Sequence, residues 1–321
     1  MSFPRAFTTG GLTLKSPYLL APMEGVSDAG FRRLCAEAGA GFGYTEMVRA
    51  RGLTKRNHST LTLVDTVDAD TPVGVQLLAV SDVELRATFE VLAELSRSTH
   101  PHFARIVAVD LNFGCPSQDI IRIGAGPALL KRRAKLRAIF EALADLKKRA
   151  VLPSVQSVSA KIRLGLNEQE RAHKVYLPVV EMANDTLDHL VIHARHAKQR
   201  SRDAPDWRAI GEAKAHSKIP IVGNGDVFSR KDAERMHEET GCDGFLIARA
   251  AIRDPCCFFA LRGEAEPSAA EKLARAEAAF ARFPPTRDKH RVFREELLAR
   301  MRAQAAGQRV EARIPDNAHL G

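Results

Sequence analysis

Eight short segments with the composition of β-strands alternate with helical patterns along most of this chain. The strand candidates are Tyr18–Met23, Phe42–Met47, Val73–Ala79, Arg105–Phe113, Val158–Leu164, His189–Arg195, Pro220–Val227 and Gly244–Ala250. Between them lie helical patterns such as Val83–Ser96, Ala134–Arg149 and Arg230–Thr240. Such alternation favours a parallel sheet, and eight units over about 250 residues predict a (β/α)₈ TIM barrel. A doubly wound dinucleotide fold is the rival, but the chain has no G-x-G-x-x-G motif.

Polar residues gather where these strands end, which is where a barrel of this kind carries its active site. They are Glu24 after the first strand, Gln76 on the third, Asn112 and Cys115 on the fourth, Lys161 and Arg163 on the fifth, His193 and Arg195 on the sixth, Asn224 and Asp226 on the seventh and Arg249 on the eighth. Lys161 is the most telling of them. A lysine inside an apolar strand needs an anionic partner, because burying its charge alone is costly.

The fourth strand runs into Asn112-Phe113-Gly114-Cys115-Pro116, a glycine-proline kink that carries a thiol. A lone cysteine is more often a small buried hydrophobic residue, but its place among the other polar strand ends favours a catalytic role. The five cysteines have irregular spacing and no C-x-x-C pair. We therefore expect reduced thiols and no metal site.

Two features predict a phosphate-bearing ligand. Gly223-Asn224-Gly225 after the seventh strand offers backbone N–H groups that an anion can approach closely. Arg249 after the eighth strand adds a bidentate cation. The loops after strands seven and eight are the usual phosphate site of the TIM barrel.

The chain has 321 residues and a formal net charge of +9, which favours a polyanionic partner. Its apolar segments are too short to cross a bilayer. The first residues do not have the pattern of a signal peptide. We therefore expect a cytoplasmic protein without membrane contact.

Several motifs, in order, resemble those of the tRNA-dihydrouridine synthases over about residues 17–260. The matching segments are Ala21–Asp28, Val75–Leu77, Asn112–Ser117, Gly124–Gly126, Lys161–Gly165, His193–Arg195, Asn224–Asp226 and Ala248–Arg249. The chain departs from the family pattern at Ile123, Ala194, His196, Ala248 and Ala250. None of these changes removes a chemical group, so they bear on cofactor fit and on the choice of uridine rather than on the reaction.

The resemblance implies an FMN enzyme that reduces the C5–C6 double bond of specific uridines in tRNA, with NADPH as the external reductant. Cys115 would be the general acid, because a protonated thiol can donate to C5. The implied cofactor-binding residues are Pro22, Met23, Glu24, Gln76, Lys161, His193, Asn224, Gly225, Asp226, Ala248 and Arg249. Of these, Asn224, Gly225, Asp226, Ala248 and Arg249 would hold the phosphate. Asn112 and Arg163 would contact the substrate.

The resemblance also implies a small helical domain after the barrel. We expect an FMN-binding barrel domain over residues 1–252 and a helical tRNA-binding domain over 253–321, with disorder from about Ala306. Ser268 and Glu271 form a predicted capping box. Two apolar stripes at helical spacing follow and predict packed helices, the first at Leu273, Ala276, Phe280 and Phe283 and the second at Phe293, Leu297 and Met301.

Basic residues after the second strand, Arg49 and Arg51, should rim the active-site mouth and contact phosphates of bound tRNA. A target uridine would have to be splayed into the pocket. We expect a monomer.

Other functions stay open from the sequence alone. One is an FMN-dependent barrel oxidoreductase that acts on a free small molecule. Another is a Schiff-base lyase with Lys161 as nucleophile, which would bind no flavin. A third is a catalytically silent RNA-binding relative, which the presence of Cys115, Lys161 and Arg249 together argues against.

Overall fold

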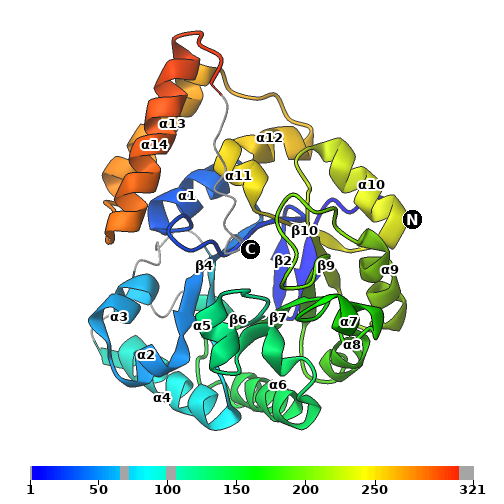
Figure 1. The fold of residues 1–321 in the computed structure, drawn as a ribbon. Coiled ribbons are helices and arrows are strands. Elements are labelled where there is room, and N and C mark those ends of the chain that lie inside the picture. The colour runs from blue at the N-terminus through cyan, green and yellow to red at the C-terminus, as the bar shows by residue number, and fades with distance from the viewer. Residues whose placement is uncertain (1, 66–71, 99–105, 311–321) are drawn as a thin grey trace.

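The computed structural model describes residues 2–65, 72–98 and 106–310. Within these residues, eight parallel strands close into a barrel in the order β10-β3-β4-β5-β6-β7-β8-β9 (Figure 1). The strands are β3 (Tyr18–Leu20), β4 (Phe42–Arg49), β5 (Val73–Leu78), β6 (Ile106–Phe113), β7 (Ser157–Arg163), β8 (His189–His193), β9 (Ile221–Asn224) and β10 (Gly244–Ile247). All eight predicted strands and the predicted barrel are confirmed.

Four strands end two or three residues earlier than predicted, which places residues expected at the site after the strand instead of on it. β3 ends at Leu20, β8 at His193, β9 at Asn224 and β10 at Ile247. Met23, Arg195, Asp226 and Arg249 therefore follow their strands instead of belonging to them. Their side chains can converge over the barrel mouth, which the pleat of a continued strand would not permit.

Helices surround the barrel on its outside (Figure 1). They are α1 (Ala29–Glu37), α2 (Ala50–Thr54), α3 (His58–Asp65), α4 (Asp82–Ser98), α5 (Gln118–Arg122), α6 (Arg133–Lys148), α7 (Glu168–Ala172), α8 (Leu177–Ala183), α9 (Trp207–His216), α10 (Arg230–Thr240), α11 (Arg249–Arg253) and α12 (Cys257–Arg262). The three helices predicted by periodicity correspond to α4, α6 and α10. The described helices do not combine the length and apolar character required to cross a membrane.

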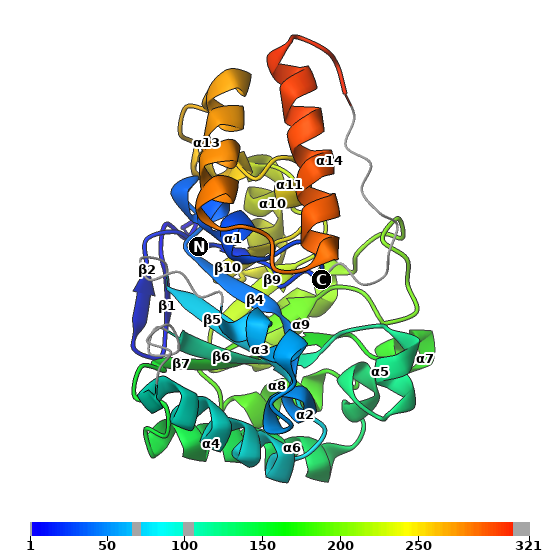
Figure 2. The same cartoon turned by 90° about the vertical axis from the view of Figure 1, so that its left-hand side faces the viewer.

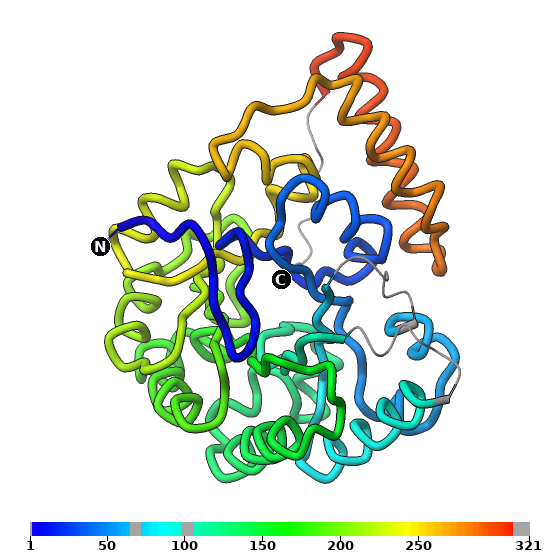
Figure 3. The backbone as a smooth tube through the Cα atoms, turned by 180° about the vertical axis from the view of Figure 1, so that it is seen from behind, coloured from blue at the N-terminus to red at the C-terminus, as the bar shows by residue number. Residues whose placement is uncertain are grey.

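A short hairpin of β1 (Phe7–Thr9) and β2 (Leu12–Leu14), which the sequence did not predict, lies across the far end of the barrel (Figure 3). The Thr9 hydroxyl lies 2.8 Å from Ser157 Oγ and 2.7 Å from His189 Nδ1. Ser157 and His189 are the first residues of β7 and β8. The hairpin therefore closes the barrel at the amino ends of its strands, opposite the predicted active site.

The barrel interior carries a line of polar side chains among its apolar layers. Tyr44 Oη lies 3.1 Å from His189 Nε2 and 3.4 Å from Ser159 Oγ, and Ser159 donates to Asp110 Oδ1 at 2.7 Å. Burial lowers the pKa of His189 to about 3, so its imidazole is neutral. The polar line leads from the closed end of the barrel to Asp110, beneath the mouth.

The chain ends in a helical hairpin, α13 (Ala269–Arg282) and α14 (Asp288–Ala305), that packs on α1 (Figures 1 and 2). The Ser268–Glu271 capping box is confirmed. Both apolar stripes face packed surfaces as predicted: Ala276, Phe280, Leu297 and Met301 are buried, and Leu273, Phe283 and Phe293 are half-buried. Residues 311–321, where most of the predicted disorder falls, lie outside the described residues.

Candidate active site

The Cys115 turn is held by the side chain of the residue three positions before it. Asn112 Oδ1 accepts hydrogen bonds from the backbone N–H groups of Gly114 at 3.1 Å and Cys115 at 2.9 Å. Cys115 is partly exposed, whereas the other four cysteines are buried, and all five are free thiols. Burial raises the pKa of the Cys115 thiol despite the opposing effects of the Ser117 backbone and the Arg163 charge. The thiol therefore stays protonated at neutral pH.

Asn112 is oriented in turn by two further side chains. Its Nδ2 donates to Gln76 Oε1 at 2.8 Å, and Gln76 Nε2 donates to Asp110 Oδ2 at 2.8 Å. Backbone N–H groups can only donate and a carboxylate can only accept, so the two ends of this chain fix the direction of both amides. Asp110 thereby determines which atom of Asn112 faces the Cys115 turn.

Lys161 lies on the strand next to Asn112, with which it is in register. Its side chain is buried, and a Cβ on Gly114 would lie 3.7 Å from Lys161 Nζ, so the ammonium lies under the Cys115 turn. Among the described residues Lys161 forms no ion pair. Burial, helped by the charge of Arg163, lowers its pKa to about 7, and burial raises the pKa of Asp110 to about 6. A buried cation of this kind is suited to an anionic or hydrogen-bond-accepting ligand.

Arg163 lies on the other side of the turn. Its Nε donates to the Gly114 carbonyl at 2.8 Å, and its Nη1 lies 3.4 Å from the carbonyl of His196. Burial lowers the pKa of Arg163 to about 10, which leaves the guanidinium charged at neutral pH. The structure thus gives Arg163 a bracing contact with the backbone before Cys115, in addition to the substrate contact predicted from the sequence.

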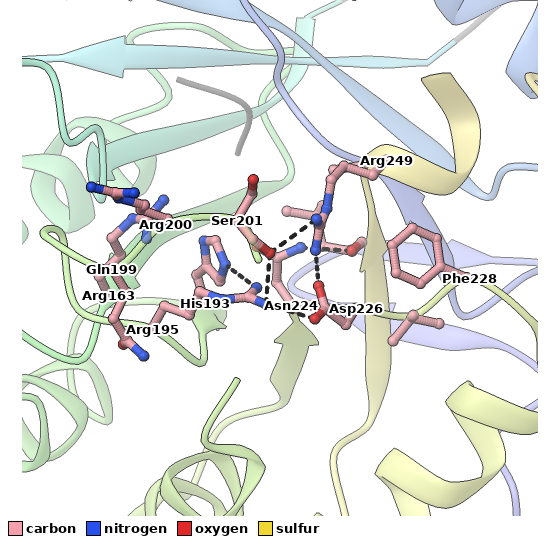
Figure 4. A pocket seen from close by; sticks show the side chains of 14 residues that line it. Arg163, His193, Arg195, Gln199, Arg200, Ser201, Asn224, Asp226, Phe228 and Arg249 are labelled. Atoms are coloured by element: carbon pink, nitrogen blue, oxygen red, sulfur yellow. Dashed lines mark hydrogen bonds and ion pairs between the residues drawn. The ribbon is translucent and has the colours of Figure 1, made fainter. Parts of the chain in front are cut away.

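A second polar group of residues lies where β8, β9 and β10 end (Figure 4). The Asp226 carboxylate bridges two guanidinium groups: Oδ2 lies 2.6 Å from Arg195 Nη2, and Oδ1 pairs with Arg249. Both arginines also donate to the Ser201 carbonyl, at 3.2 and 3.0 Å. His193 Nε2 lies 3.4 Å from Arg195 Nη1. Asp226 therefore orients two cations toward one pocket.

The backbone of this pocket is shaped for close approach. Gly225 has φ +128, and a Cβ there would lie 3.2 Å from Pro205 Cβ. Asn224 Nδ2 donates to the Leu246 carbonyl at 2.8 Å, whereas its buried Oδ1 has no hydrogen-bond partner within the described chain. Ala248 lines the same pocket just before α11. An orphaned acceptor requires a donor, so Asn224 Oδ1 suits a ligand hydroxyl, while the arginines suit a phosphate.

The loop after β3 forms a third side of the mouth. Pro22 and Met23 are buried, and the Met23 N–H donates to Ser27 Oγ at 2.8 Å. Glu24 is 44% exposed and pairs with Lys289 of α14 at 2.6 Å. Of the three residues predicted to lie against one ligand, two are thus buried and the third pairs with the C-terminal helix.

A cavity of about 820 Å³ extends from this loop along the start of α14. Its walls include Arg49, Ser117, Arg287 and Lys289. Arg51 is exposed on α2 and does not line it. Of the two arginines predicted to rim the mouth, Arg49 thus lines this cavity and Arg51 does not.

Three contributors were not assigned from the sequence. Asp110 lies two residues before Asn112 on β6, so the two side chains share one face of the strand, and this spacing could have identified Asp110 from the sequence. Arg195 was noted at a strand end but received no role, because its pairing with Asp226 depends on loops that the sequence pattern does not position. Glu46 lies among apolar residues of β4, and its buried side chain accepts a hydrogen bond from the Gly25 N–H of the loop after β3 at 2.8 Å, a partner that the strand pattern does not indicate.

Comparison with known proteins identifies the family. The sequence model described as dihydrouridine synthase (Dus) matches residues 19–312. A probable tRNA-dihydrouridine synthase of Aquifex aeolicus is 34% identical over 244 residues, which cover 76% of this chain and 72% of that protein. A probable tRNA-dihydrouridine synthase of Mycobacterium tuberculosis is 31% identical over 262 residues, which cover 79% of this chain and 64% of the relative.

Among solved structures, the old yellow enzyme from Trypanosoma cruzi is similar at a TM-score of 0.56 and 11% identity, over 89% of this chain and 99% of that one. This likeness shows the barrel fold. The family match covers nearly the whole described chain, including the Cys115 turn and the β9–β10 pocket. The chain therefore belongs to the dihydrouridine synthase family, a family of tRNA-dihydrouridine synthases.

Proposed function

We propose that this protein reduces the C5–C6 double bond of uridines in tRNA, with FMN as cofactor and NADPH as reductant. The observation that carries the proposal is a protonated, partly exposed thiol, Cys115, held over a buried Lys161 at the mouth of the barrel. The family match supports tRNA as the substrate class.

The residues present fit a flavin mononucleotide. Arg195 and Arg249 offer two oriented cations for a phosphate, and Asn224 Oδ1 is a buried acceptor in need of a hydroxyl donor. Lys161 and Gln76 lie deeper in the mouth and would bind the polar edge of the ring system. Asp226 would act on the phosphate through the arginines, since its own carboxylate would repel the anion.

When bound, the flavin supplies a hydride to C6 of the uracil. Cys115 Sγ–H then supplies the proton that C5 requires, and its raised pKa keeps that proton available at neutral pH. Asn112 fixes the backbone of the Cys115 turn, and Arg163 braces the preceding carbonyl. The thiol is thereby held in one place relative to the base, which is where proximity effects on rate arise.

The same proposal assigns a function to each of the two predicted domains. Residues 1–252 would bind the cofactor and carry out the reaction, and residues 253–321 would bind tRNA together with Arg49 and Arg51. We propose that the protein acts as a monomer in the cytoplasm, where its substrate is found. His193 and Ala248 would complete the wall of the phosphate pocket.

The test is NADPH-dependent dihydrouridine formation on unmodified tRNA by the purified, FMN-loaded protein. Replacement Cys115→Ala should retain FMN and tRNA binding but lower the rate by about 10²–10⁴-fold, the range for loss of a general acid. The matched control is Cys257→Ala, because Cys257 is a buried thiol on α12, away from the mouth.

Three results would contradict the proposal. One is a protein that does not bind FMN, which would favour the Schiff-base lyase with Lys161 as nucleophile. Another is reduction of free uridine with no reaction on tRNA, which would favour a small-molecule oxidoreductase. The third is full activity of Cys115→Ala.

A further inference from the structure

A single buried carboxylate joins the C-terminal helix to the active-site loop. Glu46, near the end of β4, has a side chain only 2% exposed. Its Oε2 accepts from the Gly25 N–H at 2.8 Å and lies 3.3 Å from Arg287 Nη1, and its Oε1 accepts from His290 Nε2. Gly25 belongs to the loop after β3, and Arg287 and His290 belong to the start of α14.

Helix α14 touches the same loop in two further ways. Gly25 has φ +74, and a Cβ there would lie 3.3 Å from Lys289 Cβ, so loop backbone and helix are in direct contact. Lys289 Nζ also pairs with Glu24 at 2.6 Å. Glu24 is close enough to Cys115 for its charge to act on the thiol. The first turn of α14 thus pairs with a carboxylate whose charge acts on the proposed proton donor.

Other contacts hold the hairpin on the barrel without touching this loop. Arg294 pairs with Asp28 at 2.7 Å, both side chains being 5% exposed. Arg300 donates to the carbonyls of Ile252 at 2.7 Å and Arg253 at 3.1 Å. His290 Nδ1 also lies 3.7 Å from Asp28 Oδ2, so the Arg300 contacts are the docking contacts that a substitution can separate from the loop.

We propose that Glu46 is a positioning residue that transmits the placement of α14 to residues 22–25, so that RNA held against the hairpin sets the geometry of the active site. The 820 Å³ cavity supports this, because both Glu24 and Lys289 line it and a substrate there would press on both. Figure 2 shows the start of α14 beside the barrel, where a ligand held against the hairpin would act on the loop. The inference rests on the proposed function.

The chemistry of the side chain explains why a carboxylate is needed. Both oxygens of Glu46 accept hydrogen bonds, one from the loop and one from the helix. A glutamine of the same shape has one acceptor oxygen, one donor nitrogen and no charge. If its oxygen accepts from Gly25, its nitrogen faces His290 Nε2, which can accept only in the Nδ1–H tautomer, and the ion pair with Arg287 is lost. Glu46→Gln should therefore uncouple helix and loop with little change in volume.

The experiment follows single turnovers of the full-length, FMN-loaded protein. Flavin is reduced with NADPH, and its reoxidation is recorded on mixing with increasing unmodified tRNA. We expect Glu46→Gln to lower the rate at saturating tRNA about tenfold or more, with tRNA affinity within about twofold of wild type, the pattern of a lost transition-state contact. Arg300→Gln, the matched control, should weaken tRNA affinity and leave the saturated rate unchanged.

A second readout uses cofactor-free protein and requires no turnover. Cys115 is the one partly exposed thiol of the five, and the charge of Glu24 in this loop acts on it, so its alkylation rate by iodoacetamide reports a displacement of the loop. A loosened loop should raise this rate about threefold or more in Glu46→Gln and leave it unchanged in Arg300→Gln. His290→Phe, which removes the helix donor, should behave like Glu46→Gln, and His290→Gln, which retains an N–H donor, should recover part of the loss.

Equal saturated rates and equal alkylation in Glu46→Gln and wild type would overturn the inference. So would a loss of the same size in Arg300→Gln, because the effect would then be docking in general. If Glu46→Gln does not fold, the two His290 variants answer the same question. If wild-type reduced flavin is not reoxidised by tRNA, the proposed function fails, and the alkylation rates still decide the coupling.

Discussion

Asn112 Oδ1 and the backbone N–H of Cys115 lie 2.9 Å apart, and this hydrogen bond ties the position of the thiol to a side chain inside the barrel. Asn112 is itself held by Gln76, and Gln76 by Asp110. The proton donor proposed for the reaction is therefore positioned from below, by a directional chain that ends in a buried carboxylate.

The direction of these hydrogen bonds can be tested by exchanging the carboxylate and the amide at positions 110 and 112. Asn112→Asp retains acceptors for the Cys115 turn but places a carboxylate against Gln76 Oε1, so we expect a loss of about 1–3 kcal/mol in unfolding free energy. In the double variant Asn112→Asp with Asp110→Asn, Gln76 can turn over and donate to residue 112 instead. Urea unfolding should show recovery of part of the loss, and simple additivity of the two single changes would contradict a directional chain.

Lys161 should make stability depend on pH. In the folded protein its pKa is lowered from 10.5 to about 7, so between these values the unfolded chain binds more protons and stability rises with pH. Lys161→Met lacks this rise. Its stability advantage over the wild type should therefore shrink between pH 7 and pH 10, by up to about 1.4 kcal/mol per pH unit.

Urea unfolding of cofactor-free protein at several pH values measures this difference. The titration of Asp110, whose pKa of about 6 lies lower, acts mainly below this range. If the stability difference between Lys161→Met and wild type stays constant from pH 7 to pH 10, burial does not lower the pKa of Lys161.

Arg249 should discriminate between phosphorylated and unphosphorylated ligands. Arg249→Met removes one of the two cations held by Asp226, so FMN affinity should fall about tenfold or more, as for loss of a charge-assisted contact. Riboflavin, which has no phosphate, should bind within about twofold of its wild-type affinity. The control is Arg253→Met, because Arg253 is exposed and stacks on the neighbouring Phe228. Equal losses for FMN and riboflavin would place the phosphate elsewhere.

Adding a side chain at Gly225 should lower the stability of the protein. Gly225→Ala forces an alanine to φ +128 and brings its Cβ within 3.2 Å of Pro205, so we expect a loss of about 1–3 kcal/mol in unfolding free energy. Gly307→Ala is the matched control, with φ +79 and open space around the added Cβ. Thermal unfolding of both variants compares the stability lost at a crowded position with that lost at an open one. Equal losses would mean that Pro205 moves aside at little cost in free energy.

Arg49 and Arg51 should contribute to tRNA binding through charge. Replacing both with alanine should weaken affinity and lower the slope of log affinity against log salt by about one to two units. Since Arg49 lines the mouth cavity and Arg51 does not, Arg49→Ala alone should account for most of the change. Filter binding at four salt concentrations measures the slopes, and unchanged slopes would remove this rim from the RNA-binding surface.

The sequence by itself determined the barrel, the eight strand positions and most of the residues at the mouth. Strand and helix periodicities are local, and the motif around Cys115 is contiguous, so both can be read without knowing what packs where. The ends of the strands were less well determined. Arg195 and Arg249 were predicted within strands but follow them, because loop contacts and not local preference decide where these strands end.

The tertiary structure alone decided which charges meet. Pairing of β5 with β6 places Asp110 beside Gln76, and the loops after β8 and β9 bring Arg195 to Asp226. Docking of α14 brings His290 to Glu46 across 244 residues of chain. Such pairs depend on how distant elements are brought together, and a carboxylate in an apolar strand gives no local signal of the partner that will neutralise it.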